Sequence, residues 1–507
     1  SSLGWSRRLF RTPLGPDKPA YSACDRLLTT PGLLKKSNSR KRNSAGFRMA
    51  WRCLVASIVA LVASSCQANT NVLRASCLWN ESPEKESSVQ VDCSRKGLTI
   101  VPAGSVWPRN IYKMDLSHNF IDHITHLEPS NVSVLDLHDN RIAIVEPRVF
   151  SAFPRLQFLD LSKNSLEVLH GDVFVNMTSL RALNLSGNKL TYPPTELFRP
   201  LVSLEQLNLN MNPLRYLRDG LFRLPNLERL ELSSINAHSL PDGIFHETPR
   251  LVYLDLSGNL FDKVPSSALR SADGLKVLVM SDNPVGTLGY NSFFKLHNIE
   301  ELYVEKMKDL EAVEGDTFAY QKKMRSLFLG NNPKLKSIDL DIFGVFWRVE
   351  PAANWTLREF YLQNNNIEYL DEDVAPWREF EILDLQGNPW VCDCNNAWIR
   401  RLPLQKELTV QLRCGGPPAY EHKPMLEVPD EVFACPSLRV EREQSSTFRT
   451  GVLVVGALSI SAILLSAILL IKRKNLYQRF MSRKNRNGSV YYVKAHTNPV
   501  DGFDPSA

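Results

Sequence analysis

Residues 156–166 have the sequence LQFLDLSKNSL, and the same pattern returns as LRALNLSGNKL at 180–190 and as LEQLNLNMNPL at 204–214. The shared form, L-x-x-L-x-L-x-x-N-x-L, recurs about every 23–25 residues between 110 and 390. Further copies centre on Asn119, Asn140, Asn259, Asn283, Asn332, Asn365 and Asn388. A fixed period of this length is typical of a solenoid, so we expect about twelve stacked coils.

The spacing within each copy predicts one short strand per coil. Alternate residues of a strand point to opposite faces, so the two leucines of L-x-L point inward and the residue between them points out onto a concave face. Stacked coils then pair these strands into one parallel sheet. The asparagine follows where the chain leaves the sheet, and its amide is suited to bond buried backbone groups there. A second apolar column is expected on the return side at Phe150, Phe174, Phe198, Phe222, Phe245, Phe294, Phe318 and Phe343.

Three coils depart from the pattern. Ile235 replaces one asparagine, with Asn236 one place late, and Met307 replaces another. The coil between Asn332 and Asn365 is about nine residues too long. Its insertion, at 340–356, contains Trp347, Pro351 and Trp355. Insertions in solenoids form surface loops, so this one is either a functional loop or a tolerated one.

Cysteines lie on both sides of the repeats, where a solenoid needs caps to cover its core. Cys77 and Cys93 precede the repeats, and four more follow them at Cys392, Cys394, Cys414 and Cys435. In a secreted protein such cysteines indicate disulfides, although four cysteines in one cap allow three pairings. A zinc site is the competing explanation. The oxidising compartment and the lack of paired C-x-x-C spacing argue against it.

The repeats, together with NPWVCDC at 388–394, resemble the extracellular leucine-rich-repeat superfamily that has cysteine-rich caps at both ends. That superfamily includes Toll-like receptors and leucine-rich-repeat cell-adhesion proteins. The resemblance covers about 77–435 and implies a leucine-rich-repeat solenoid, a horseshoe with a parallel β-sheet on its concave face and an irregular or short-helical convex side. It also implies the pairings Cys392–Cys414 and Cys394–Cys435. The later coils look most like arthropod proteins of the tartan and capricious type, although the N-terminal cap has two cysteines where many members have four.

Two apolar segments predict the topology. A basic start at Met49, an apolar run and small residues up to Ala68 are typical of a secretory signal peptide. Residues 451–471 carry no charge and are long enough to span a bilayer, and basic residues follow at once. The predicted divisions are a basic extension taken as disordered (1–48), the signal peptide (49–68), an N-terminal cap (69–109), the repeats (110–390), a C-terminal cap (391–436), a linker (437–450), a transmembrane helix (451–471) and a cytoplasmic tail (472–507).

The charge of +6 is unevenly distributed. Residues 49–471 carry 41 basic and 50 acidic residues, so the positive excess lies outside the expected fold and nucleic acid is not a predicted partner. The basic start of the tail is suited to attract anionic lipid headgroups. Sequons for N-glycosylation, in keeping with an extracellular domain, begin at Asn80, Asn131, Asn176, Asn184 and Asn354.

The outward residue of each L-x-L defines a predicted concave column. In order, its members are Asp115, Asp136, Asp160, Asn184, Asn208, Glu231, Asp255, Val279, Tyr303, Phe328, Tyr361 and Asp384. Exposed aromatic stripes are typical anchors for protein partners, so the predicted binding patch is Val279, Tyr303, Phe328 and Tyr361, extended by Tyr253 and Val277. A glycan on Asn184 would steer a partner toward this half. Two alternatives remain: the long insertion covers the rings, or a cationic partner uses the acidic part of the column.

No catalytic motif accompanies the repeats, the ten histidines are scattered, and we expect no enzyme activity, cofactor or metal. A tail of 36 residues is too short for a kinase or a Toll-type signalling domain. The sequence predicts a single-pass plasma-membrane protein for recognition or cell adhesion, with a cell-surface protein or a second copy of itself as partner. The alternatives are a receptor or co-receptor, including an innate-immune one, that signals through a partner chain, and a tether to the matrix.

Overall fold

The computed structural model describes residues 77–81, 89–102, 107, 110–345, 355–435 and 472. The predicted N-terminal extension, signal peptide, membrane span and nearly all of the tail lie outside these residues. Within the described residues, no helix is both long and apolar enough to cross a bilayer.

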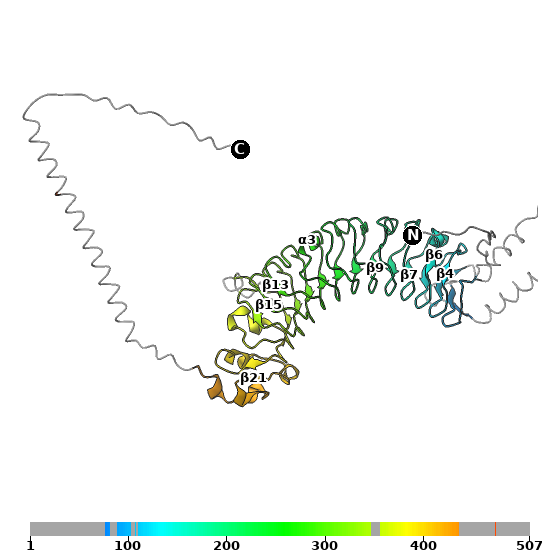
Figure 1. Ribbon diagram of the computed structural model, residues 1–507. Helices are drawn as coiled ribbons and strands as arrows, with labels where there is room; N and C mark the ends of the chain where they lie inside the picture. Colours follow the sequence, from blue (N-terminus) through cyan, green and yellow to red (C-terminus); the bar gives the residue numbers. More distant parts are fainter. Residues whose placement is uncertain are drawn as a thin grey trace, which may run out of the picture. The chain divides into compact units, whose positions relative to one another are not determined.

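The repeats form a curved solenoid whose strands lie along the inner side of the curve (Figure 1). Thirteen parallel strands, one per coil, form this sheet in the described part of the chain, and β1(Leu78–Glu81) adds an antiparallel edge at its N-terminal end. The strands are β2(Val89–Asp92), β3(Ile111–Asp115), β5(Val134–Asp136), β7(Phe158–Asp160), β8(Ala182–Asn184), β9(Gln206–Asn208), β10(Arg229–Glu231), β11(Tyr253–Asp255), β12(Val277–Val279), β14(Glu301–Tyr303), β16(Ser326–Phe328), β18(Glu359–Tyr361) and β19(Ile382–Asp384). The predicted twelve coils, plus one from the N-terminal cap, are therefore present.

The convex side has only short elements, because a coil of this length leaves few residues after its strand and turn. It includes the sheet of β13(Thr287–Leu288), β15(Ala312–Val313) and β17(Ser337–Ile338), the pair β4(His123–Ile124) and β6(Ile144–Val145), the helix α3(Ser266–Leu269), and the 3-10 helices η2(Val149–Ala152), η4(Glu372–Val374) and η5(Trp377–Glu379). The C-terminal cap comprises β20(Trp390–Val391), β21(Cys414–Gly416), η6(Ala397–Arg401), η7(Lys406–Thr409), η8(Pro418–Tyr420), η9(Met425–Glu427) and η10(Asp430–Phe433).

The repeat asparagines form a buried ladder that joins neighbouring coils. Asn164 donates from Nδ2 to the carbonyls of Leu161 and Leu137, each at 3.0 Å. Its Oδ1 accepts from the N–H of Ile142 at 2.9 Å. The predicted role of these amides is confirmed. Where Ile235 and Met307 stand instead, both side chains are fully buried.

The phenylalanine column confirms the return-side core at all but one position. Phe150, Phe174, Phe198 and Phe222 stack with ring centroids 6.2–6.4 Å apart. The prediction of Phe294 was wrong, because its neighbour Phe293 is buried and stacks on Phe318 at 5.9 Å. In the preceding coil the column is filled by Leu269, and Phe293 follows it after one full period of 24 residues.

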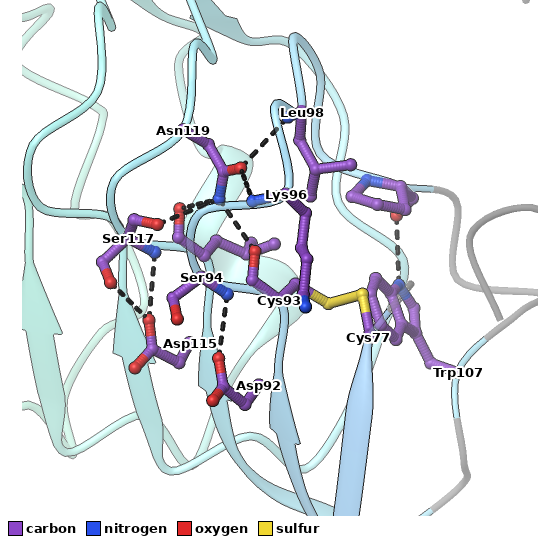
Figure 2. Close-up of a disulfide and its surroundings, with 12 residues drawn as sticks. Cys77, Asp92, Cys93, Ser94, Lys96, Leu98, Trp107, Asp115, Ser117 and Asn119 are labelled. Carbon is purple, nitrogen blue, oxygen red and sulfur yellow. Dashed lines mark hydrogen bonds between the residues drawn. A yellow bond between two sulfur atoms is a disulfide. The ribbon is translucent and has the colours of Figure 1, made fainter. Parts of the chain in front are cut away.

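The N-terminal cap is closed by a disulfide and joined to the first repeat by the asparagine ladder. Cys77 and Cys93 are bonded, with Cα atoms 4.5 Å apart. Figure 2 shows Asn119 beside this disulfide, donating to the Cys93 carbonyl at 2.9 Å. Asn119 also accepts from the N–H groups of Lys96 and Leu98 at 2.9 and 3.0 Å. At this edge the disulfide holds the cap together, and Asn119 pairs three backbone groups of the cap.

The C-terminal cap is built around tryptophans and disulfides. Cys392 bonds Cys414, with Cα atoms 5.5 Å apart, and Cys394 and Cys435 are also disulfide-bonded. Trp390 is fully buried and donates from its indole to the Leu385 carbonyl at 2.8 Å. The cap thus covers the last coil with large rings whose polar atoms are paired.

The unusually long coil ends against the core. Trp355 packs edge-on against Phe343 and Phe380, with ring centroids 5.2 and 6.1 Å apart. Residues 346–354, which include Trp347 and Pro351, lie outside the described residues. The functional role of the insertion, including the idea that it covers the concave rings, stays a prediction.

Candidate protein-binding surface

The strand register places the predicted concave column in a single row. Each member pairs with the next across the sheet, from Asp115 opposite Asp136 to Tyr361 opposite Asp384. All twelve side chains are partly exposed. The predicted alignment, in which polar residues give way to apolar ones along one face, is therefore confirmed.

Polar members of the row form hydrogen bonds with the backbone just after their strands end. Asp115, Asp160 and Asp255 each accept from the backbone N–H two residues later, at 2.8–3.0 Å. The equivalent bond in the N-terminal cap, from Ser94 to Asp92 (Figure 2), lowers the pKa of that carboxyl. Asp384 makes the same bond after the apolar stretch, to the N–H of Gln386 at 3.0 Å.

Three rings replace these caps on neighbouring strands. Tyr303 and Phe328 stack with centroids 4.1 Å apart and planes 4° apart, and Phe328 and Tyr361 stack at 4.5 Å and 5°. We call these three residues the aromatic ladder. Its spacing is close to the roughly 4.8 Å between paired strands, so the register of the sheet sets the stacking. The rings cannot accept the backbone bond that Asp provides at other coils, and the ladder therefore has no equivalent structural task.

Carboxylates flank the ladder and keep its hydroxyls protonated. The Tyr303 hydroxyl donates to Oε2 of Glu301 at 3.0 Å. Partial burial and this carboxylate raise the pKa of Tyr303 well above its usual value. Partial burial and the charges of Glu359 and Asp384 raise the pKa of Tyr361. The ladder thus presents the edges of stacked rings, with hydroxyl donors beside acidic groups.

The extension predicted at Tyr253 and Val277 differs in character from the ladder. Val277 and Val279 lie on β12 between Tyr253 and the first ladder strand. The Arg229 guanidinium lies over the Tyr253 ring, 3.4 Å from its centroid, and its Nε donates to Glu231 at 2.6 Å. Val279 therefore continues the apolar surface, whereas Tyr253 adjoins it with one face covered by a cation.

Sequence reasoning missed the polar partners of the rings. Glu301 and Glu359 stand two residues before Tyr303 and Tyr361, so both side chains lie on the same face as the rings. The repeated E-x-Y at these two strands was the available signal. Arg229 gave no comparable signal, because its contact with Tyr253 crosses to another coil.

The predicted glycosylation sites lie in different surroundings. Asn131 and Asn176 are exposed. Asn184 lies on β8 of the concave sheet, partly exposed, and donates to Asp160 at 2.9 Å. Asn80 lies on β1, and Asn354 falls outside the described residues. The acidic and amide side chains near Asn184 bond one another, as Asn208 does with Glu231 at 2.7 Å.

Comparisons with known proteins agree with the repeat. The family model described as Leucine rich repeat matches residues 109–166, 130–190, 154–214, 202–261 and 249–306. The same coil continues in the structure as far as β19. The chain is a leucine-rich-repeat solenoid of about thirteen coils, with extended concave surfaces of the kind such proteins use for binding.

Known proteins are similar to parts of this chain. The chain is 26% identical to the Oplophorus-luciferin 2-monooxygenase non-catalytic subunit of Oplophorus gracilirostris, over 38% of this chain and 57% of that protein. It is 28% identical to Leucine-rich repeat and transmembrane domain-containing protein 1 of Mus musculus, over 17% of this chain and 24% of that protein. The solved structure of the Toll–Spatzle complex from Drosophila is similar over 65% of this chain and 55% of that chain, with 20% identity and a TM-score of 0.44. The matches thus span little more than half of the first relative and about a quarter of the second.

Proposed function

We propose that this protein binds a protein partner at the cell surface, through the aromatic ladder of its concave face, and that it acts in recognition or cell adhesion without catalysis of its own. The observation that carries the proposal is the stack of Tyr303, Phe328 and Tyr361, partly exposed and in register on three neighbouring strands. Aromatic anchors contribute most to the free energy of protein interfaces.

The arrangement of the ladder favours binding for two physical reasons. Rings already stacked on paired strands lose little side-chain entropy when a partner covers them. The four coils from Val279 to Tyr361 also give up the backbone bond that Asp255 and Asp384 make on either side, so the rings are not there to cap a strand end. A partner that covers the rings would bury their exposed apolar surface, which favours binding.

The proposed location is the plasma membrane, with the solenoid outside the cell. Disulfides in both caps favour an oxidising compartment. The predicted signal peptide at 49–68 and the predicted span at 451–471 supply the topology. The predicted glycans are proposed on the same grounds, as is the contact of the basic tail with anionic lipids. The narrower resemblance to tartan and capricious remains part of the proposal.

The test uses the full-length chain displayed on suspension cells. Cells that carry it are mixed with one another, and separately with a library of soluble cell-surface ectodomains. Clumping of like cells indicates homophilic adhesion, whereas capture of a soluble protein indicates a heterophilic receptor. We expect Tyr303→Ala/Phe328→Ala/Tyr361→Ala to abolish the interaction at equal surface expression.

A matched control removes three rings from the convex side. Tyr290, Phe294 and Tyr320 form a surface cluster there, with ring centroids 4.9–5.8 Å apart. The triple alanine variant of this cluster should bind as the wild type does. Equal binding by the concave variant and the wild type would reject the ladder as the site. Absence of any binding by the wild type would reject recognition of proteins and favour a tether.

A further inference from the structure

Two histidines that the sequence left apart meet at the N-terminal end of the concave face. His118 follows β3 at a turn, with φ of 54°, and His138 follows β5. Their Nε2 atoms lie 3.2 Å apart, and their rings are nearly perpendicular at 76°. The two side chains are 32% and 27% exposed, so solvent reaches both.

The other nitrogen of each ring faces a carboxylate. Nδ1 of His118 lies 2.6 Å from Asp139, and Nδ1 of His138 lies 2.7 Å from Asp136. An ionised carboxylate only accepts hydrogen bonds, so each Nδ1 carries a proton. In a neutral imidazole the proton on Nδ1 leaves Nε2 with a bare lone pair. The ring centroids are 4.6 Å apart, closer than a head-on arrangement of the two rings would allow, so the two lone pairs converge beside the pair, where one cation can accept both.

We propose that His118 and His138 bind one divalent transition metal ion of the zinc type through their Nε2 atoms. With metal–nitrogen bonds of about 2.05 Å, nitrogens 3.2 Å apart subtend roughly 100° at the metal, close to the tetrahedral angle. Imidazole suits Zn²⁺, Cu²⁺ and Ni²⁺. A carboxylate on the remote nitrogen is the usual support of such a ligand, since it fixes the tautomer and raises the basicity of the bound nitrogen.

The surroundings favour a cation and leave coordination positions open. Asp115 and Asp136 occupy the neighbouring places in the concave row, so the local charge is negative. Among the described residues, no three metal-ligating side chains come together. The remaining positions belong to water or to a group that a partner brings. The site is separate from the aromatic ladder, and it does not depend on the proposed function.

The measurement is calorimetric titration of Zn²⁺ into the purified full-length chain at pH 7.4, with spectroscopy of bound Cu²⁺ to count nitrogen ligands. The variants are His118→Asn, which tolerates the positive φ, and His138→Ser, since serine occupies the equivalent position of the next coil at Ser162. Each should lower Zn²⁺ affinity at least tenfold and reduce the nitrogen signal. Asp139→Asn should lower it about tenfold to a hundredfold while both ligands remain.

The control is His123→Asn, because His123 lies in the same coil and contacts Asp122 instead of the pair. It should bind Zn²⁺ as the wild type does. The proposal is overturned by equal Zn²⁺ binding in the wild type and in the double variant His118→Asn/His138→Ser, which would place the metal elsewhere. It is also overturned by the absence of Zn²⁺ binding to the wild type at pH 7.4.

Discussion

The two halves of the concave row have the same backbone and carry different chemistry. From Asp115 to Asp255 the side chains cap strand ends or bond one another, as Asn184 does with Asp160. From Val279 to Tyr361 the caps are replaced by a valine and a stack of rings, and Asp384 then resumes the first pattern. In the polar half, the side chains of the row stabilise the coil by capping strand ends or bonding one another. In the apolar half, they make no such bond to the backbone, and this difference is the evidence for a binding role.

The largest effect is expected from breaking the core that both halves share. Phe198 is fully buried between Phe174 and Phe222, so Phe198→Ala should lower the free energy of unfolding by about 3–5 kcal/mol. Thermal unfolding followed by circular dichroism measures this. Phe294→Ala, at the partly exposed neighbour of Phe293, is the control and should cost much less. A loss as large as that of Phe198→Ala would contradict the assignment of Phe293 to the core.

The asparagine ladder should come next in size. Asn164→Ala leaves the buried N–H of Ile142 without a partner. It also removes one of the two asparagine bonds to each of the Leu137 and Leu161 carbonyls, which keep Asn140 and Asn188. Buried groups left unpaired cost about 1–3 kcal/mol, so we expect a loss of roughly 2 kcal/mol in unfolding free energy. The exposed Asn291 provides the control, and Asn291→Ala should unfold as the wild type does. Equal stability of Asn164→Ala and the wild type would show that the ladder does not hold the coils together.

A smaller effect should follow from lengthening the aromatic ladder. Val279 is in register with Tyr303, so Val279→Tyr adds a fourth stacked ring and should stabilise the fold by about 0.5–1.5 kcal/mol. The same substitution in the polar half, Asp160→Tyr, removes the bond to the N–H of Ser162 and should destabilise it. Chemical denaturation of both variants compares the halves directly. Stabilisation by Asp160→Tyr as well would remove the distinction between them.

The smallest effect is a dependence of the unfolding free energy on pH, which appears only above about pH 10. The pKa of Tyr303 is raised, so the fold favours the protonated hydroxyl. This contribution to stability is complete below the unfolded pKa of about 10 and is lost as the pH rises above it. Ultraviolet titration of the wild type against Tyr303→Phe should show one tyrosine that ionises well above pH 10. A difference spectrum that titrates near pH 10 would contradict the contact with Glu301.

The sequence predicted the features that the repeat itself imposes. Strand positions, the concave row and the role of the asparagines follow from a period that each coil must satisfy. The convex side is less constrained by the repeat. Phe293 and Phe294 are adjacent residues of the same type, so the sequence could not show which of them is buried in the core. Contacts between long side chains of different coils were also missed. His118 and His138 are 20 residues apart, and they meet because they occupy consecutive turns, a geometry that a scattered set of histidines does not reveal.

The most direct test of the central claim measures the affinity of the displayed full-length chain for its partner in two single variants. One variant lacks a ring in the apolar half, and the other lacks a ring in the polar half. Phe328 is the middle of the ladder, and Phe158 is a 36% exposed phenylalanine on the same face in the polar half. We expect Phe328→Ala to cost about 2 kcal/mol or more, roughly thirtyfold in Kd, and Phe158→Ala to leave Kd within about twofold. An equal loss in both variants, or a loss only in Phe158→Ala, would contradict the claim that the C-terminal half of the concave face is the binding surface.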